Sequence, residues 1–146
     1  MLKMISQVEP NISNEDVQNV TEYMSSGSWI TEHKVTKKLE ENVARYVNRK
    51  YSVAVPNGTI AIYLALLASG IKEGHKVAVP NVTMIATINA IIWAGAQPVI
   101  IDTDESLCMS EESLKSISDI DAVIFVPLNG RTGSGIKIQD YCKKNN

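Results

Sequence analysis

The segment Asn57-Gly58-Thr59 stands between an apolar run typical of a strand and an apolar run typical of a helix. A helix that begins just after such a segment presents unpaired backbone N–H groups and the positive end of its dipole, and both attract a phosphate. The same residue types also suit a tight turn followed by an N-cap, with Thr59 as the cap. By itself the segment indicates either an anion site or a plain turn.

Two further polar segments follow predicted strands, Asn81-Val82-Thr83 and Asn129-Gly130-Arg131. In an open parallel sheet, ligands bind beyond the carboxyl ends of the strands, so we expect all three polar segments to face one crevice. The dinucleotide pattern GxGxxG and the triphosphate pattern GxxxxGK[ST] are both absent from the sequence. The residues therefore favour a compact monophosphate at one helix start over a long polyphosphate.

Four other titratable side chains have weaker patterns. His33 and His75 have no carboxylate or thiol partner at a suggestive spacing, which favours solvated histidines over general acid–base groups. Asp102 and Asp104 could form a carboxylate pair or a metal site. Because they stand at the end of a predicted strand before a turn, capping and solvation are favoured.

The elements that would position these residues are predicted from apolar periodicity. Residues 13–26, opened by Ser13 and Asp16 as a capping box, and residues 32–48 are predicted to be amphipathic helices. Short apolar runs then predict parallel strands at 52–55, 76–80, 98–102 and 122–127. Helices are expected to begin near Thr59, Met84 and Ser110, with a last one at 136–144. Repeated strand–helix–strand units of this kind predict an α/β fold with right-handed crossovers.

Two of the predicted helices, at 59–69 and 84–94, are apolar nearly all round. Such helices are normally buried on every side, here between the sheet and another layer. A chain of 146 residues has little with which to bury two of them. The pattern therefore predicts that a further part of the structure, or a partner subunit, covers these helices.

Composition narrows the class of protein. A hydrophobic content of 45% in 146 residues predicts a real core, and a net charge of -2 without lysine clusters argues against a nucleic-acid partner. Cys108 and Cys142 form neither a zinc pattern nor a disulfide framework. With no sustained apolar segment, we expect a cytoplasmic protein without a membrane partner. We expect a helical segment at 1–50 and an α/β portion at 51–146, with no domain boundary inside the chain.

The run VPNGTIAIYLALLASGIKEGHKVAVPNVTMIATINAIIWAGAQPVIIDTD carries several motifs in order. It has a Gly-Thr-Ala-like turn opening an apolar helix, a "GD-V-VP" strand, a "T-aromatic-x-A-T-x-N-A" helix and "GA-P-V-x-D-D". In these features the chain resembles the DegT/DnrJ/EryC1/StrS family of pyridoxal-phosphate-dependent sugar aminotransferases, and SGSWIT resembles the family's amino-terminal substrate segment. The resemblance implies a three-layer α/β sandwich with a mostly parallel sheet, part of the large domain of fold type I transferases.

The resemblance also implies roles for individual residues. Gly58, Thr59 and Ile60 would bind the phosphate of pyridoxal 5'-phosphate (PLP) through backbone N–H groups and the Thr hydroxyl. Met84 stands where the family usually has an aromatic ring stacked on the cofactor, and a thioether covers a ring face with less contact. The alternative for Met84 is a core-filling side chain. Thr87 matches a family position near the cofactor, with a helix-surface role as its alternative.

The substrate contacts implied by the resemblance are Thr31 and Asn129. Thr31 would face the sugar, and its alternative role is an N-cap for the following helix. Asn129-Gly130 stands where the family often has His-x-Tyr-Gly, a departure that would alter the substrate contact.

Pyridoxal chemistry needs a lysine that binds the cofactor covalently and a carboxylate that keeps the pyridine nitrogen protonated. In the family both lie downstream of the position where this chain stops, and Lys137, Lys143 and Lys144 do not match the lysine motif. The resemblance therefore implies an incomplete large domain at 1–146, without the carboxyl-terminal small domain and without a catalytic residue. We expect this chain by itself to be unable to complete a transamination.

By resemblance, the complete enzyme would convert a nucleotide-linked keto sugar into an amino sugar, with glutamate as the amino donor. It would act as a homodimer with shared active sites. Two alternatives stay open at this point: a non-catalytic fragment or binding and dimerisation module, and a PLP-dependent sugar dehydratase of the same family.

Overall fold

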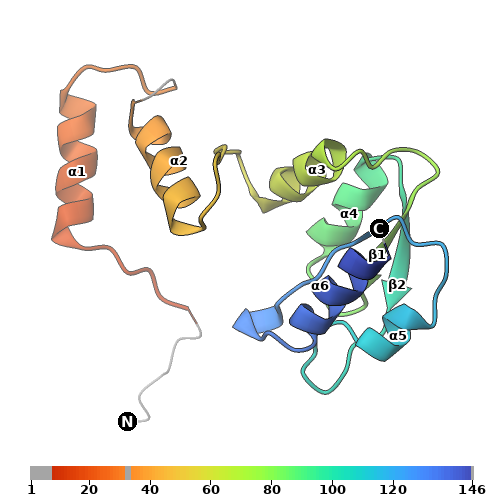
Figure 1. Cartoon of the computed structure of the whole chain (residues 1–146). Coiled ribbons are helices and arrows are strands. Elements are labelled where there is room, and N and C mark those ends of the chain that lie inside the picture. Colours follow the sequence, from red (N-terminus) through yellow and green to blue (C-terminus); the bar gives the residue numbers. More distant parts are fainter. Residues whose placement is uncertain (1–7, 32–33, 146) are drawn as a thin grey trace, which may run out of the picture. The chain divides into compact units, whose positions relative to one another are not determined.

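The computed structural model describes residues 8–31 and 34–145. The chain divides into two compact units, Met1–Ala54 and Val55–Asn146. The first unit is helical, and the second holds the sheet (Figure 1).

The first unit contains helices α1 (Asn14–Ser25) and α2 (Lys34–Tyr46), which confirms both predicted amphipathic helices. The capping box is present: the Ser13 hydroxyl accepts from the Asp16 amide at 3.1 Å, and the Asp16 carboxylate accepts from the Ser13 amide at 2.8 Å. These bonds satisfy N–H groups that a helix start otherwise leaves unpaired. Within the described part of this unit, Ala44 is the residue that becomes buried.

The second unit is built on a parallel sheet of three strands in the order β2-β1-β3. The strands are β1 (Lys76–Pro80), β2 (Gln97–Ile101) and β3 (Ala122–Val123). Strand β1 lies in the centre, with Val77 opposite Pro98 on one side and Ala122 on the other. Its continuous apolar sequence fits this position, because a central parallel strand is covered on both faces.

Helices cover both faces of this sheet (Figure 1). The helices are α3 (Gly58–Ala68), α4 (Ile85–Trp93), α5 (Glu111–Lys115) and α6 (Gly135–Lys144). Val77 and Val79 pack in one core with Ile91 of α4, whereas Ala78 packs in a second core with Ile138 of α6. Successive strand residues point to opposite faces, so the two cores lie on opposite sides of β1. The expected three-layer α/β sandwich is confirmed.

Two strand predictions differ from the structure. Residues 52–55 form no strand, and Val53 is 74% exposed. A strand is held by hydrogen bonds to a neighbouring strand, and no described strand pairs with these residues. The predicted strand at 122–127 ends at Val123, although the Ile124 amide still donates to the Ala78 carbonyl at 2.8 Å. Apolar sequence indicates a preference for strand, but pairing decides the boundary.

The two helices predicted to be buried all round are buried on one side only. Leu66 of α3 and Ile91 of α4 belong to the core, whereas Leu64 is 43% and Trp93 is 55% exposed. The sheet and the contact between α3 and α4 cover the inner sides of these helices. Their apolar outer sides face solvent in this chain. That a further part of the structure or a partner subunit covers them stays a prediction. Across the described residues, no helix combines the length and the apolarity that crossing a bilayer requires.

Candidate cofactor site at the carboxyl edge of the sheet

Helices α3 and α4 both begin at the carboxyl edge of the sheet. Helix α4 begins after the short connection from the end of β1, at Ile85. Helix α3 leads through a turn into the amino end of β1, so its own first residues lie toward the opposite, carboxyl end. The two helices pack against each other, and each leads into the amino end of a strand, α3 into β1 and α4 into β2. Their starts therefore share the edge where ligands bind in open α/β sheets.

The start of α3 is capped by Asn57, in extended backbone with φ of -165°. Its side-chain oxygen accepts a hydrogen bond from the Ile60 amide at 3.0 Å. The N-cap is therefore Asn57, and the alternative of Thr59 as the cap is wrong. The sequence signal was present, because Asn ranks with Asp and Ser among the best N-cap residues.

Of the three backbone amides predicted to bind the phosphate, one is already hydrogen-bonded to the cap and two are not. The Ile60 amide is already engaged by Asn57, whereas the amides of Gly58 and Thr59 donate to no described group. Apart from its chain neighbours and the backbone of α3, a Cβ placed on Gly58 would meet no atom within 4 Å, so the space beside this glycine is open. Two free amides and the Thr59 hydroxyl therefore stand at the positive end of the α3 dipole, as an anion site requires. Phosphate binding by Gly58, Thr59 and Ile60 itself stays a prediction.

Met84 precedes α4 as its N-cap residue and makes no side-chain cap hydrogen bond. Its side chain is 72% exposed, so the alternative of a core-filling methionine is wrong. An exposed thioether at this edge is free to cover a flat ring.

Thr87, in the first turn of α4, is only 4% exposed, so the alternative of a helix-surface role is wrong. Its hydroxyl lies 2.9 Å from the hydroxyl of Thr83 in the segment that follows β1. This bond fixes the end of β1 to the start of α4. Sequence reasoning missed the pairing, although the spacing of four residues on adjoining segments was visible.

The strand ends are joined by a polar bridge. The Asn81 side-chain amide donates to the Asp102 carboxylate at 3.1 Å, and the Asn81 backbone amide donates to the Ile101 carbonyl at 2.9 Å. Asp104 instead accepts from the amide and hydroxyl of Ser106 and from the hydroxyl of Ser134. Over residues 8–31 and 34–145, no group of three or more His, Cys, Asp or Glu residues could hold a metal ion. The structural interpretation of both aspartates is therefore favoured over a metal site.

Asp104 gives the protein an expected acid sensitivity. Hydrogen bonds from the Ser106 hydroxyl and amide lower the pKa of Asp104 below its ordinary value of 3.8. A carboxyl whose pKa is lower in the folded state stabilises the fold above its unfolded pKa, and this contribution is lost as the pH falls through the folded pKa. We expect Asp104→Asn to lower the urea midpoint at pH 7, and the difference from wild type to shrink below about pH 4. A difference that stays constant between these pH values would contradict this role.

The remaining predicted site residues belong to three other segments of the chain. Thr31 is exposed in the first unit, and His33 lies outside the described residues. Asn129 is exposed in the turn Leu128–Gly130 after β3, with φ of 52°, a conformation that Asn tolerates better than most residues. His75 is half-buried with its Nδ1 atom unpaired, so it is less solvated than predicted. It precedes β1, at the amino end of the sheet, away from the candidate site.

Comparison with known proteins decides the family. Residues 10–146 match the DegT/DnrJ/EryC1/StrS aminotransferase family. The chain belongs to this family. The match covers α1 to α6, so it includes the starts of both α3 and α4.

Relatives and solved structures support the same assignment. GDP-perosamine synthase of Escherichia coli O157:H7 is 33% identical over 99% of this chain and 41% of its own length. An aminotransferase structure from Psychrobacter cryohalolentis has a TM-score of 0.85 at 27% identity, over 92% of this chain and 35% of its own. The PLP form of the putative sugar aminotransferase Spr1654 from Streptococcus pneumoniae has a TM-score of 0.77 at 30% identity, over 84% of this chain and 32% of its own. The 146-residue chain therefore spans about two fifths or less of the length of each of these three proteins.

Proposed function

We propose that residues 1–146 are the amino-terminal part of a PLP-dependent aminotransferase that converts a nucleotide-linked keto sugar into an amino sugar, with glutamate as amino donor. The observation that carries the proposal is the start of α3, where the amides of Gly58 and Thr59 donate to no described group and the space beside Gly58 is open. Membership of the family, together with the PLP form of the Streptococcus pneumoniae relative, suggests the phosphate of PLP as the anion.

The residues present fit the cofactor. The amides of Gly58 and Thr59, with the Thr59 hydroxyl, would hold its phosphate, and the α3 dipole would stabilise the negative charge. Asn57 orients this turn through its bond to the Ile60 amide. Met84 is exposed at the same edge and would cover one face of the ring. When bound, PLP supplies an electron sink for the carbon that gains or loses the amine.

Other requirements of the reaction are proposed to lie outside this chain. The lysine and the carboxylate that PLP chemistry needs would come from the downstream part of the complete enzyme, together with its small domain. Thr87 belongs to the second layer of the site in this proposal, because its hydroxyl is paired with Thr83 inside the fold. Thr31 and Asn129 are proposed sugar contacts, and the complete enzyme is proposed to be a homodimer.

The proposal is tested by PLP binding to the complete enzyme with and without Gly58→Ala. Gly58 has no neighbour within 4 Å and no positive φ, so the fold itself does not need a glycine there. A methyl group over the amides would obstruct the phosphate, and we expect PLP affinity to fall by about tenfold or more, or about 1.4 kcal/mol. Cofactor absorbance during a PLP titration measures this change.

Two controls accompany the titration. Urea denaturation of the apoprotein should show equal or slightly higher stability for Gly58→Ala, because alanine restricts the unfolded chain. The Ser110 hydroxyl caps α5 by accepting a hydrogen bond from the Ser113 amide at 3.2 Å. Ser110→Ala removes this cap and should leave PLP affinity unchanged. Equal affinity in Gly58→Ala and wild type would refute phosphate binding at α3. Failure to form a lysine adduct with PLP on borohydride reduction would favour a non-catalytic module.

A further inference from the structure

Arg131, in the loop between β3 and α6, has a fixed backbone and an exposed side chain. Its amide donates to the Leu128 carbonyl at 3.0 Å, and its carbonyl accepts from the Cys108 thiol at 3.6 Å. Its guanidinium makes no hydrogen bond or ion pair with residues 8–31 or 34–145. By contrast, the guanidinium groups of Arg45 and Arg49 each donate a hydrogen bond at 3.3 Å. The fold therefore holds Arg131 in place and leaves its five N–H donors for another group.

The turn before Arg131 contains two successive residues in the left-handed conformation. Asn129 has φ of 52° and Gly130 has φ of 77°. A residue other than glycine is uncommon in this region, and such conformations concentrate at functional sites, where the surrounding structure maintains them. Here the Gly130 amide donates to the Pro127 carbonyl at 3.0 Å, in addition to the bond from the Arg131 amide. The turn therefore presents Arg131 in one defined backbone conformation.

The loop that follows β2 contacts the segment directly after Arg131. The Ser134 hydroxyl donates to the Asp104 carboxylate at 3.2 Å. Gly133 packs so closely that a Cβ there would lie 2.6 Å from the Ser106 hydroxyl oxygen and 2.7 Å from the Cys108 Cβ. Two loops, one after β2 and one after β3, therefore meet at the carboxyl edge of the sheet. Helices α3 and α4 begin at this same edge, where ligands bind in open α/β sheets.

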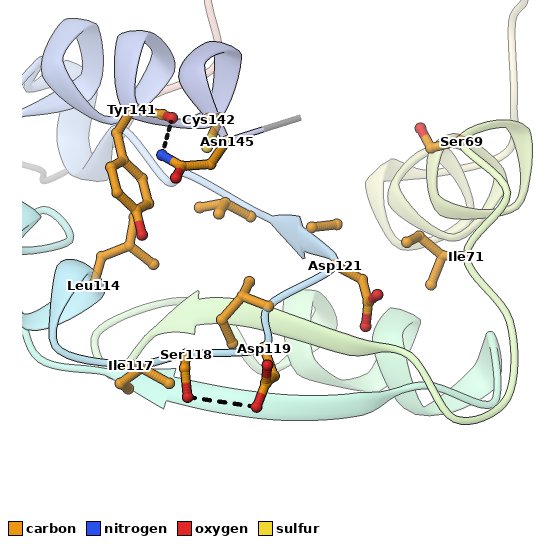
Figure 2. A pocket seen from close by; sticks show the side chains of 13 residues that line it. Ser69, Ile71, Leu114, Ile117, Ser118, Asp119, Asp121, Tyr141, Cys142 and Asn145 are labelled. Atoms are coloured by element: carbon orange, nitrogen blue, oxygen red, sulfur yellow. Dashed lines mark hydrogen bonds between the residues drawn. The ribbon is translucent and has the colours of Figure 1, made fainter.

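A cavity of about 630 Å³ beside β3 has the opposite charge (Figure 2). Asp119 and Asp121 line it and directly precede β3, so the cavity includes the amino end of this strand. Lysine, arginine and histidine are absent from the described residues that line it. Its two carboxylates would repel a phosphate or another carboxylate. An anionic ligand therefore fits the edge that carries Arg131 better than it fits this cavity.

We propose that the guanidinium of Arg131 binds an anionic group of a substrate. The choice of substrates rests on the proposed function: glutamate carries carboxylates, and a nucleotide-linked sugar carries phosphates. A guanidinium matches both groups, because its fork of N–H donors forms two parallel hydrogen bonds with a carboxylate or a phosphate. Arg131 is also the only arginine after residue 49 in the sequence, so no other arginine of the second unit can take this role.

Arg131→Gln and Arg131→Lys in the complete enzyme test this role. The reaction of the PLP-loaded enzyme with glutamate alone, followed by cofactor absorbance, reports on the amino donor. Isothermal titration with GDP, UDP and dTDP reports on the nucleotide diphosphate. We expect Arg131→Gln to weaken binding of glutamate or of a nucleoside diphosphate by at least about tenfold, while PLP affinity and the limiting rate with glutamate stay unchanged. Arg131→Lys should recover part of the loss, because lysine keeps the charge but not the fork.

Lys143→Gln is the matched control, because it also removes one positive charge, from an exposed side chain that pairs with Asp140 at 4.0 Å near the end of α6. A loss confined to glutamate would assign Arg131 to the donor carboxylate, and a loss confined to the nucleoside diphosphates would assign it to the phosphates. Unchanged affinities in Arg131→Gln, or an equal loss in Lys143→Gln, would overturn the role of Arg131 alone. A wild-type enzyme that neither reacts with glutamate nor binds a nucleoside diphosphate would refute the proposed function, and the role of Arg131 with it.

Discussion

Gly133→Ala is expected to lower the free energy of unfolding by roughly 2–5 kcal/mol. Gly133 has φ of +43°, in the left-handed region, and a Cβ there would lie 2.6 Å from the Ser106 hydroxyl oxygen and 2.7 Å from the Cys108 Cβ. Cys108 is fully buried, so its side chain has little room to move. The substitution therefore combines an unfavourable backbone conformation with overpacking between two loops.

Urea denaturation followed by Trp fluorescence or circular dichroism measures this loss. Gly58→Ala is the matched control, because its Cβ would meet no neighbour within 4 Å and its φ is not positive. The control should change stability by less than about 1 kcal/mol. If Gly133→Ala were as stable as the control, the close packing of Gly133 against the loop around Ser106 would be contradicted.

Asn57→Asp is expected to weaken PLP binding by the complete enzyme by about tenfold to a hundredfold, or about 1.4–2.7 kcal/mol. Aspartate is as good an N-cap as asparagine, so its carboxylate can keep the bond to the Ile60 amide and the helix stays formed. The change adds a negative charge beside the proposed phosphate. Affinity should therefore fall while the stability of the apoprotein stays close to that of wild type.

Asn57→Ser separates the charge from the cap. Serine also caps helices well but carries no charge, so we expect it to bind PLP within a few-fold of wild type. Isothermal titration or cofactor absorbance gives both affinities. Equal affinities for Asn57→Asp and Asn57→Ser would show that no phosphate lies near the start of α3.

Most of the fold was predictable because local patterns agree with tertiary structure. The Ser13 capping box, the apolar run of β1 and the starts of α3 to α6 follow from residue types and spacing. Residues 52–55 have an equally apolar sequence but form no strand. Residues 76–80 form a strand and residues 52–55 do not, because only the former have neighbouring strands to pair with. These partners are distant in sequence, so a local sequence pattern does not reveal them.

The candidate site was predictable in its location and less so in its hydrogen bonds. The polar segments after β1 and before α3 follow from the rule for parallel sheets. The sequence does not show which amides stay free for a phosphate, because the choice of Asn57 over Thr59 as the N-cap depends on backbone geometry. The exposure of Met84 was equally invisible in the sequence, since an apolar residue at a helix start suits both a core and a ligand surface.

Aminotransferase activity is tested most directly by following the transfer of isotopically labelled nitrogen from glutamate to a nucleotide-linked keto sugar, with the complete enzyme and PLP. We expect a nucleotide-linked amino sugar that carries the label, with 2-oxoglutarate formed in equal amount, and a large loss of product in Asn57→Asp. A deoxygenated sugar without the label would identify a dehydratase instead. The absence of any PLP-dependent product across a panel of nucleotide-linked keto sugars would contradict the proposed function.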